Sequence, residues 1–203
     1  MSSEQSSLFA DVDTATPQSS ETLADINTEL LARVQALPQF TGRILVFGEG
    51  QPQASVAVIG ESPGVPDLDS GRPFMGPAGD MLTRILSAIG LTRAGCYLTN
   101  TVKMISTGDE LTPDVLSVFT PYLHRELATV RPKVVIAFGN TPTRALLNTK
   151  KGITSVRGEF HDYRGMKLMP TFNPAYLLRD PTKKREVWED MKQVRDLLAA
   201  FKD

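Results

Sequence analysis

Apolar and polar residues along this chain follow two periods, one typical of buried strands and one typical of helices. Four short, mostly apolar runs predict core strands, because a strand that is buried on both faces has no polar side. These runs cover residues 55–59, 97–102, 134–138 and 167–171. A further short strand is predicted at 44–47, where it would form a hairpin with 55–59.

Between these runs, apolar residues recur every three or four positions, which predicts amphipathic helices. We expect helices at 21–37, 77–89, 112–130, 141–147 and 181–201. Thr112 is expected to act as an N-cap, and Gly90 to end the second helix. Strands and helices alternate, so the pattern predicts a single α/β domain over residues 21–203. Its central, mostly parallel four-stranded sheet would have helices on both faces.

The charge is distributed unevenly along the chain. Residues 1–20 are rich in Ser, Thr, Asp and Gln, which predicts a disordered acidic tail. The net charge is -1, but the first 30 residues hold six acidic residues and no Lys or Arg. The remainder therefore has 22 basic and 17 acidic residues, a net charge of +5, which is compatible with phosphate binding.

The composition also limits the other partners that we expect. The chain has one cysteine, Cys96, and two histidines, His124 and His161, whose spacing matches no metal-ligand motif. We therefore expect no disulfide, metal or other cofactor. A long apolar run and a signal-peptide pattern are both missing from the sequence, so we expect a cytoplasmic monomer that does not bind membranes.

Polar side chains follow each of the four predicted core strands. They are Glu61, Asn100, Asn140 and Asn173, and Phe74 lies in the loop after Glu61. Because the carboxyl ends of parallel strands meet at one edge of a sheet, we expect these side chains to lie together. A carboxylate, amides and an aromatic ring suit a flat heterocycle that is held by stacking and by hydrogen bonds to its edge. The arrangement predicts a nucleobase pocket.

Ordinary structural roles are the alternative for each of these residues. Gly60 and Gly64 either let the backbone approach a bound group closely or serve turn geometry alone. Asn100 and Asn140 can act as caps, and Phe74 can belong to the core. Their shared position at the strand ends favours the pocket.

The segment 60–64, Gly-Glu-Ser-Pro-Gly, also fits the nucleophile elbow of α/β-hydrolases, with Ser62 and either His124 or His161 as catalytic residues. That elbow uses the backbone N–H of the residue after the serine and turns directly into a helix. Pro63 has no N–H group, so the sequence disfavours this interpretation.

Seven segments resemble the iron-sulfur group of uracil-DNA glycosylases, usually called family 4, in the same order along the chain. They are Val46-Phe47-Gly48-Glu49-Gly50, Gly60-Glu61-Ser62-Pro63-Gly64, 71–79 (Gly-Arg-Pro-Phe-Met-Gly-Pro-Ala-Gly), 97–103 (Tyr-Leu-Thr-Asn-Thr-Val-Lys), 132–140, Arg157-Gly158 and 173–179 (Asn-Pro-Ala-Tyr-Leu-Leu-Arg). The resemblance spans residues 44–195. It implies a glycosylase of base excision repair that removes uracil or another deaminated base flipped out of DNA.

The resemblance also implies roles for individual residues. Glu61 would orient the attacking water and stabilise the positive sugar, Phe74 would stack on the base and Asn100 would read its edge. The segment 173–179 would enter the minor groove of the DNA.

Side chains around that segment are the expected DNA contacts. Leu177 or Leu178 would act as a wedge beside Arg179, and core packing is the alternative for the two leucines. Arg157, Arg179 and Lys183 are the expected phosphate contacts.

The chain departs from the family pattern at three places. Four cysteines hold the family's cluster, but residues 26–46 contain none, and Met104 and Phe119 stand where others are expected. We expect these apolar side chains to fill the volume, without a cluster. Asn173 replaces a histidine that donates to the leaving base, although an amide can also donate. Leu68 stands where the family tends to have an acid, next to Asp67.

These departures leave a second function open, a non-catalytic member of the superfamily that binds DNA or nucleotides. Asn173 and the missing cysteines favour it. Glu61 opposes it, because a carboxylate beside a phosphodiester weakens binding unless the chemistry uses it.

Overall fold

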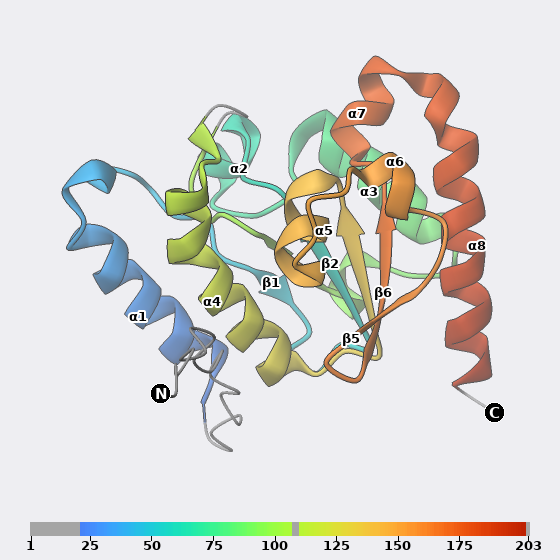
Figure 1. The fold of residues 1–203 in the computed structure, drawn as a ribbon, viewed down its shortest axis with the longest axis horizontal. Helices are drawn as coiled ribbons and strands as arrows, with labels where there is room; N and C mark the ends of the chain where they lie inside the picture. The colour runs from blue at the N-terminus through green and yellow to red at the C-terminus, as the bar shows by residue number, and fades with distance from the viewer. Residues whose placement is uncertain (1–20, 107–109, 202–203) are drawn as a thin grey trace, which may run out of the picture.

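The computed structural model describes residues 21–106 and 110–201, so the predicted tail at 1–20 lies outside the described residues. Six strands form one sheet in the order β1-β3-β2-β4-β6-β5 (Figure 1). The four central strands, which are parallel, are β3 (Tyr97–Asn100), β2 (Val56–Gly60), β4 (Val134–Phe138) and β6 (Met166–Thr171). The predicted parallel core is confirmed. The outer strands, β1 (Glu49–Gly50) and β5 (His161–Tyr163), run antiparallel to their neighbours, so the sheet is mixed.

The predicted hairpin between 44–47 and 55–59 is wrong. Residues 44–47 form no strand, and β1 pairs with β3 instead, with Glu49 opposite Leu98. Both edges of β2 are already occupied by β3 and β4, so the preceding segment can add only to the outer edge of β3. The backbone N–H of Val46 donates to the carbonyl of Lys103 at 2.7 Å, just beyond the end of β3.

The edge strand β5 was not predicted. It pairs with β6 through a turn in which Arg164 and Gly165 have φ values of 48° and 82°. Positive φ at both central residues suits a two-residue hairpin, but Asn-Gly or Asp-Gly is the usual sequence signal for it.

The five predicted helices are confirmed within a few residues, and three short ones were not predicted. The α-helices of the described chain are α1 (Leu23–Gln35), α2 (Val65–Ser70), α3 (Gly76–Ala88), α4 (Pro113–Val130), α5 (Asn140–Leu147), α6 (Ile153–Val156), α7 (Pro174–Arg179) and α8 (Lys184–Ala200). Short 3-10 turns lie at Pro38–Phe40, Arg93–Gly95 and Pro181–Lys183. Thr112 caps α4 as predicted, since its hydroxyl accepts from the N–H of Val115. Among the described residues, no helix has the length and apolar character that a membrane crossing needs.

Helices cover both faces of the sheet (Figure 1). Val56 and Val58 of β2 pack against α3, α7 and α8, while Ala57 and Ile59 face the other way, toward α4 and α5. This alternation places every side chain of β2 in an apolar environment, which explains its uninterrupted apolar sequence.

A third apolar cluster joins α1 to α4 and contains both residues that replace cysteines. Met104 and Phe119 are buried there, and the Phe119 ring lies 6.0 Å from that of Phe40. The expected apolar packing of Met104 and Phe119 is confirmed. Cys96 belongs to a different cluster, where burial raises the pKa of its thiol to about 11. The residues present therefore do not fit an iron-sulfur cluster, which needs thiolate ligands.

We accordingly predict that the protein is colourless after anaerobic purification. A single cysteine cannot supply the ligands of a cluster. Iron and acid-labile sulfide assays should give values far below one equivalent per chain. Stoichiometric iron and sulfide would contradict the prediction.

Candidate active site

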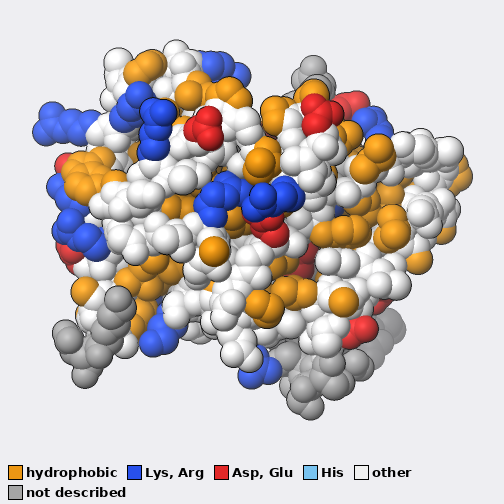
Figure 2. All heavy atoms as spheres, turned by 180° about the vertical axis from the view of Figure 1, so that it is seen from behind, with side chains coloured by type: hydrophobic (Ala, Val, Ile, Leu, Met, Phe, Trp, Pro, Cys, Tyr) orange, Lys and Arg blue, Asp and Glu red, His pale blue; other side chains and the backbone are white. Residues whose placement is uncertain are grey.

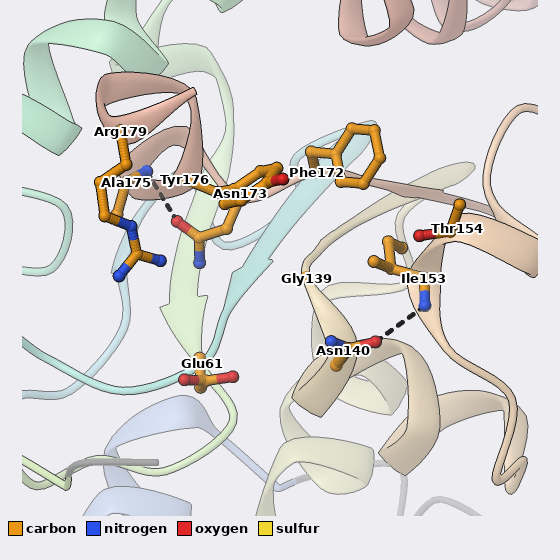
Figure 3. Close-up of a pocket in the computed structure, with 10 residues that line it drawn as sticks. All are labelled: Glu61, Gly139, Asn140, Ile153, Thr154, Phe172, Asn173, Ala175, Tyr176 and Arg179. Atoms are coloured by element: carbon orange, nitrogen blue, oxygen red, sulfur yellow. Dashed lines mark hydrogen bonds between the residues drawn. The ribbon is translucent and has the colours of Figure 1, made fainter. Parts of the chain in front are cut away.

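The carboxyl ends of the central strands meet at one edge of the sheet, as predicted. Gly60 lies opposite Asn100 in the sheet register, and Phe138 lies opposite Thr171. A cavity of about 390 Å³ opens at this edge (Figure 3). It is lined by Glu61, Gly139, Asn140, Ile153, Thr154, Phe172, Asn173, Ala175, Tyr176 and Arg179.

Glu61 leaves the end of β2 and lies in this cavity (Figure 3). The hydroxyl of Thr141, in the first turn of α5, donates to Oε2 of Glu61 at 2.5 Å. This bond fixes the orientation of the carboxylate and leaves Oε1 for a water or a ligand. Thr141 was not predicted as a site residue, because its only signal is its place directly after the strand-end residue Asn140.

The side chain of Asn173 is oriented by its role as the N-cap of α7. Its Oδ1 accepts from the N–H of Ala175 at 2.9 Å, and its Nδ2 makes a long contact, 3.4 Å, with the carbonyl of Phe138. Figure 3 shows the amide nitrogen pointing toward the space above Glu61. Because capping engages the oxygen, the donor end of the amide faces the cavity.

Asn140 also lines the cavity, but it is not a helix cap. Gly139 occupies the N-cap position of α5, and Oδ1 of Asn140 accepts from the N–H of Ile153 at 2.7 Å. Asn140 thereby attaches the start of α6 to the end of β4, on one wall of the cavity.

The residues predicted to bind the base lie beside this cavity, in a more buried position. A Cβ atom placed on Gly60 would lie 2.2 Å from Oδ1 of Asn100 and 2.7 Å from Cζ of Phe74. Both side chains therefore press against Gly60, where only glycine fits. Gly64 is different, because a Cβ there would meet only Pro66 at 3.6 Å. Gly64 is the N-cap residue of α2 and donates its N–H to Asp67, so it is placed for turn geometry.

Asn100 has an unpaired donor in this buried position. The residue is 3% exposed, and its Nδ2 has no hydrogen-bond acceptor among the described residues. Leaving a buried polar group unsatisfied costs about 1–3 kcal/mol, so an acceptor on a ligand would be favoured at this point.

Lys103 binds the backbone of Asn100 from the protein core. Its buried ammonium group donates to the carbonyl of Asn100 at 2.6 Å, to Thr99 at 2.7 Å and to Glu126 at 2.8 Å. Burial lowers the pKa of Lys103, and the charge of Glu126 opposes that effect. Lys103 therefore supports the strand end from the core and does not reach the cavity.

The two leucines of α7 have different environments. Leu177 is 1% exposed and packs in the core, whereas Leu178 is 44% exposed. Core packing, the alternative given for the two leucines, therefore holds for Leu177, and Leu178 stays the candidate wedge. Arg179 follows it, lines the cavity and lies over the ring of Tyr176.

Arg157 and Lys183 are held by acidic residues of α8. The guanidinium group of Arg157 binds Asp190 and Glu186, and the ammonium group of Lys183 binds Glu186 at 2.7 Å. Asp190 also accepts from Thr171, so Arg157 braces α8 against the end of β6. A phosphate contact by Arg157 would compete with these bonds, so its assignment as a DNA contact stays a prediction.

On one face of the molecule, the basic side chains do not form a continuous surface (Figure 2). On the face seen in Figure 2, Lys and Arg gather in several separate clusters with acidic and apolar atoms between them. Phosphate contacts on that face would therefore depend on individual basic side chains.

The serine hydrolase alternative is wrong. Ser62 donates to the carbonyl of Ser106, His124 bonds to Tyr163, and His161 bonds to the carbonyl of Val156. In the described part of the chain, these three side chains are therefore engaged separately and do not form a Ser-His pair with one another.

The fold and the site together define an α/β protein whose carboxylate and amides meet at the carboxyl edge of a mostly parallel sheet. The chain belongs to the uracil-DNA glycosylase superfamily, whose model matches residues 47–192.

Three known proteins are similar to most of the chain, and each is named a type-4 uracil-DNA glycosylase. The protein from Thermotoga maritima is 33% identical over 184 residues, which cover 88% of this chain and 96% of that protein. The protein from Saccharolobus solfataricus is 34% identical over 165 residues, covering 76% of each chain. The protein from Archaeoglobus fulgidus is 29% identical over 186 residues, covering 87% of this chain and 94% of its own length.

Proposed function

We propose that this protein is a DNA glycosylase that hydrolyses the N-glycosidic bond of uracil, or of another deaminated base, flipped out of DNA. Its superfamily and the names of its relatives support this function. The observation that carries the proposal is the unpaired amide nitrogen of Asn100, buried beside Phe74 and Gly60. A carbonyl oxygen on the edge of a flipped base would accept from this donor, while the ring of Phe74 would stack on the base.

The cavity residues would carry out the chemistry. Glu61 would hold a water and stabilise the positive charge that develops on the sugar. The bond between C1′ and the base breaks with its electron pair leaving on the base, and the water oxygen forms the new bond to C1′ while its proton passes to the carboxylate of Glu61. The departing base anion then takes up a proton from the solvent. Asn173 would donate from Nδ2 to the base oxygen on which the negative charge develops. The products are a free base and an abasic site.

Leu178 is the residue that we propose as the wedge in duplex DNA. Leu178→Ala should slow excision from a duplex by about 10-fold, because unstacking a base costs a few kcal/mol that the wedge helps to offset. Excision from single strands should change little, since the base there is already unstacked. Leu177→Ala, the neighbouring control, should instead lower the free energy of unfolding by about 2–5 kcal/mol. If Leu178→Ala slows excision equally from duplexes and from single strands, Leu178 does not act as a wedge.

The direct test of the proposed function is an excision assay. Oligonucleotides carrying uracil, hypoxanthine or xanthine, as single strands and as duplexes, are incubated with the protein, and abasic sites are cleaved and counted. We expect release of at least one of these bases at a rate that depends on Glu61.

A non-catalytic DNA-binding protein is the second candidate, and it is favoured by the presence of Asn173 in place of the family's histidine and by the missing cysteines. If none of the three bases is released while the protein still binds DNA, this second function replaces the first.

A further inference from the structure

The segment 46–50 belongs to the sequence pattern of the superfamily, yet none of its side chains lines the cavity. Glu49, on the edge strand β1, makes its contacts elsewhere. Its carboxylate accepts from Arg72 at 2.7 and 3.2 Å and from Arg93 at 3.0 Å. Burial would raise the pKa of Glu49, but the bonds from Arg72 and Arg93 outweigh that effect and place it below its usual value.

Arg93 connects Glu49 to the loop that carries Phe74. Its Nη1 donates to the carbonyl of Phe74 at 2.9 Å, and its Nη2 donates to the carbonyl of Pro73 at 2.8 Å. One guanidinium group therefore bridges a carboxylate on β1 and two successive carbonyl groups. Its planar, forked donors suit this task, and a lysine ammonium group cannot reproduce the geometry.

The backbone of Phe74 needs such support because it is strained. Its φ is 57°, in the left-handed region that side chains other than glycine rarely adopt. A residue held in such a region costs about 1–3 kcal/mol and persists only where the surrounding structure maintains it.

Two further contacts fix the peptide group that follows this strained residue, which consists of the carbonyl of Phe74 and the N–H of Met75. The N–H of Met75 donates to Asp67 at 2.6 Å. A Cβ on Gly79 would lie only 1.8 Å from the carbonyl oxygen of Phe74, so that oxygen occupies the space of a side chain on α3. The loop is therefore built to hold Phe74 in one conformation, with its ring against Gly60.

We infer that Glu49 and Arg93 are positioning residues, which hold Phe74 in its left-handed conformation so that its ring is placed to stack on a flipped base. This inference rests on the proposed function. It assigns a role to segment 46–50, since the charge of Glu49 orients the guanidinium group that holds the loop. Rotation of Phe74 into an ordinary conformation would swing the ring away from Gly60 and from Asn100.

Arg72 is a natural control for Arg93. Both bind Glu49, but the side chain of Arg72 is 56% exposed and that of Arg93 only 19%, and Arg93 alone donates to the carbonyls of Pro73 and Phe74. An exposed ion pair such as Arg72–Glu49 contributes about 0–1 kcal/mol. Arg93→Lys should slow single-turnover excision by about 10- to 100-fold, as expected when a binding group is misplaced by about 1 Å. Arg72→Gln should change the rate by less than about 2-fold.

A double-mutant cycle separates positioning from general destabilisation. If Arg93 acts through Phe74, the double variant Arg93→Lys with Phe74→Ala should excise no more slowly than Phe74→Ala alone. If the rate loss of the double variant equals the product of the losses of the two single variants, the inference is overturned. An unchanged rate in Arg93→Lys would overturn it as well. Thermal unfolding of each variant gives the fraction folded, to which the rates are normalised.

Hydrogen exchange tests the same inference without any enzyme activity. The amide of Met75 should exchange about 10-fold faster in Arg93→Lys than in the wild type, because local opening of the loop becomes easier, and it should not change in Arg72→Gln. If the wild type releases no base, the proposed function fails, and this exchange comparison alone decides whether Arg93 holds the loop. Unchanged exchange in Arg93→Lys would overturn the inference.

Discussion

Glu61→Gln should lower base excision by about 10²- to 10⁴-fold, the usual contribution of a positioned acid or base. The substitution keeps the size of the side chain and its ability to accept from Thr141, but it removes the negative charge. The transition state carries positive charge on the sugar, whereas the bound substrate does not, so the loss should fall on the chemical step. Binding to uracil-containing DNA should persist or become tighter, because a carboxylate near the phosphates is gone.

Single-turnover rates and a gel-shift titration would measure the two effects separately. Asp69→Asn is the matched control, because Asp69 is an exposed carboxylate on the neighbouring helix α2. This control should leave both the excision rate and the affinity for DNA unchanged. If Glu61→Gln excises at the rate of the wild type, Glu61 has no part in the mechanism. If it loses rate and DNA affinity equally, its role is in binding.

Asn173→Ala should slow excision by about 10²- to 10³-fold, the typical effect of removing a donor to a developing oxyanion. The same substitution also removes the N-cap of α7, which should lower the free energy of unfolding by about 1 kcal/mol. These two effects can be separated, because they come from opposite ends of the amide. Oδ1 caps the helix, and Nδ2 faces the cavity.

The variant Asn173→Asp separates the loss of the donor from the loss of the helix cap. Asp is as good an N-cap as Asn, so stability should be preserved, but a carboxylate cannot donate and repels the negative charge of the leaving base. Its excision rate should be at least as low as that of Asn173→Ala. A rate close to that of the wild type would show that Nδ2 is not the donor.

Asn173→His tests the departure from the family pattern. Histidine also carries a donor, so excision of uracil should be preserved or faster than in the wild type. If the wild type and Asn173→His both release no base, the non-catalytic function is the better conclusion.

Prediction from sequence worked best where the signal is local. The runs at 56–60 and 134–138 are apolar throughout because both faces of those strands are buried, and their periodicity could be read without knowing their neighbours. A helix cap such as Thr112 is also a local signal, because its hydrogen bond is to a residue three positions along the chain. The position of Asn173 at a strand end followed directly from these assignments.

The edges of the sheet could not be predicted in this way. A strand was predicted at 44–47 and paired with the nearest strand in sequence, 55–59. The strand that forms is β1, at Glu49–Gly50, and it pairs with β3, where Glu49 lies opposite Leu98. The choice depends on which strand edge remains free after the parallel core has formed, and no local pattern contains that information.

The sequence alone therefore determined the four core strands, the main helices and the polar residues that follow the strands. These depend on periodicity and on the rule that parallel strands end at one edge. The tertiary structure decided that Thr141 holds Glu61, that Arg93 holds Phe74, and that Arg157 serves α8. Each of these contacts joins residues far apart in the chain. Whether a charged side chain faces a ligand or a partner within the protein depends on the packing of whole elements, which the local sequence does not specify.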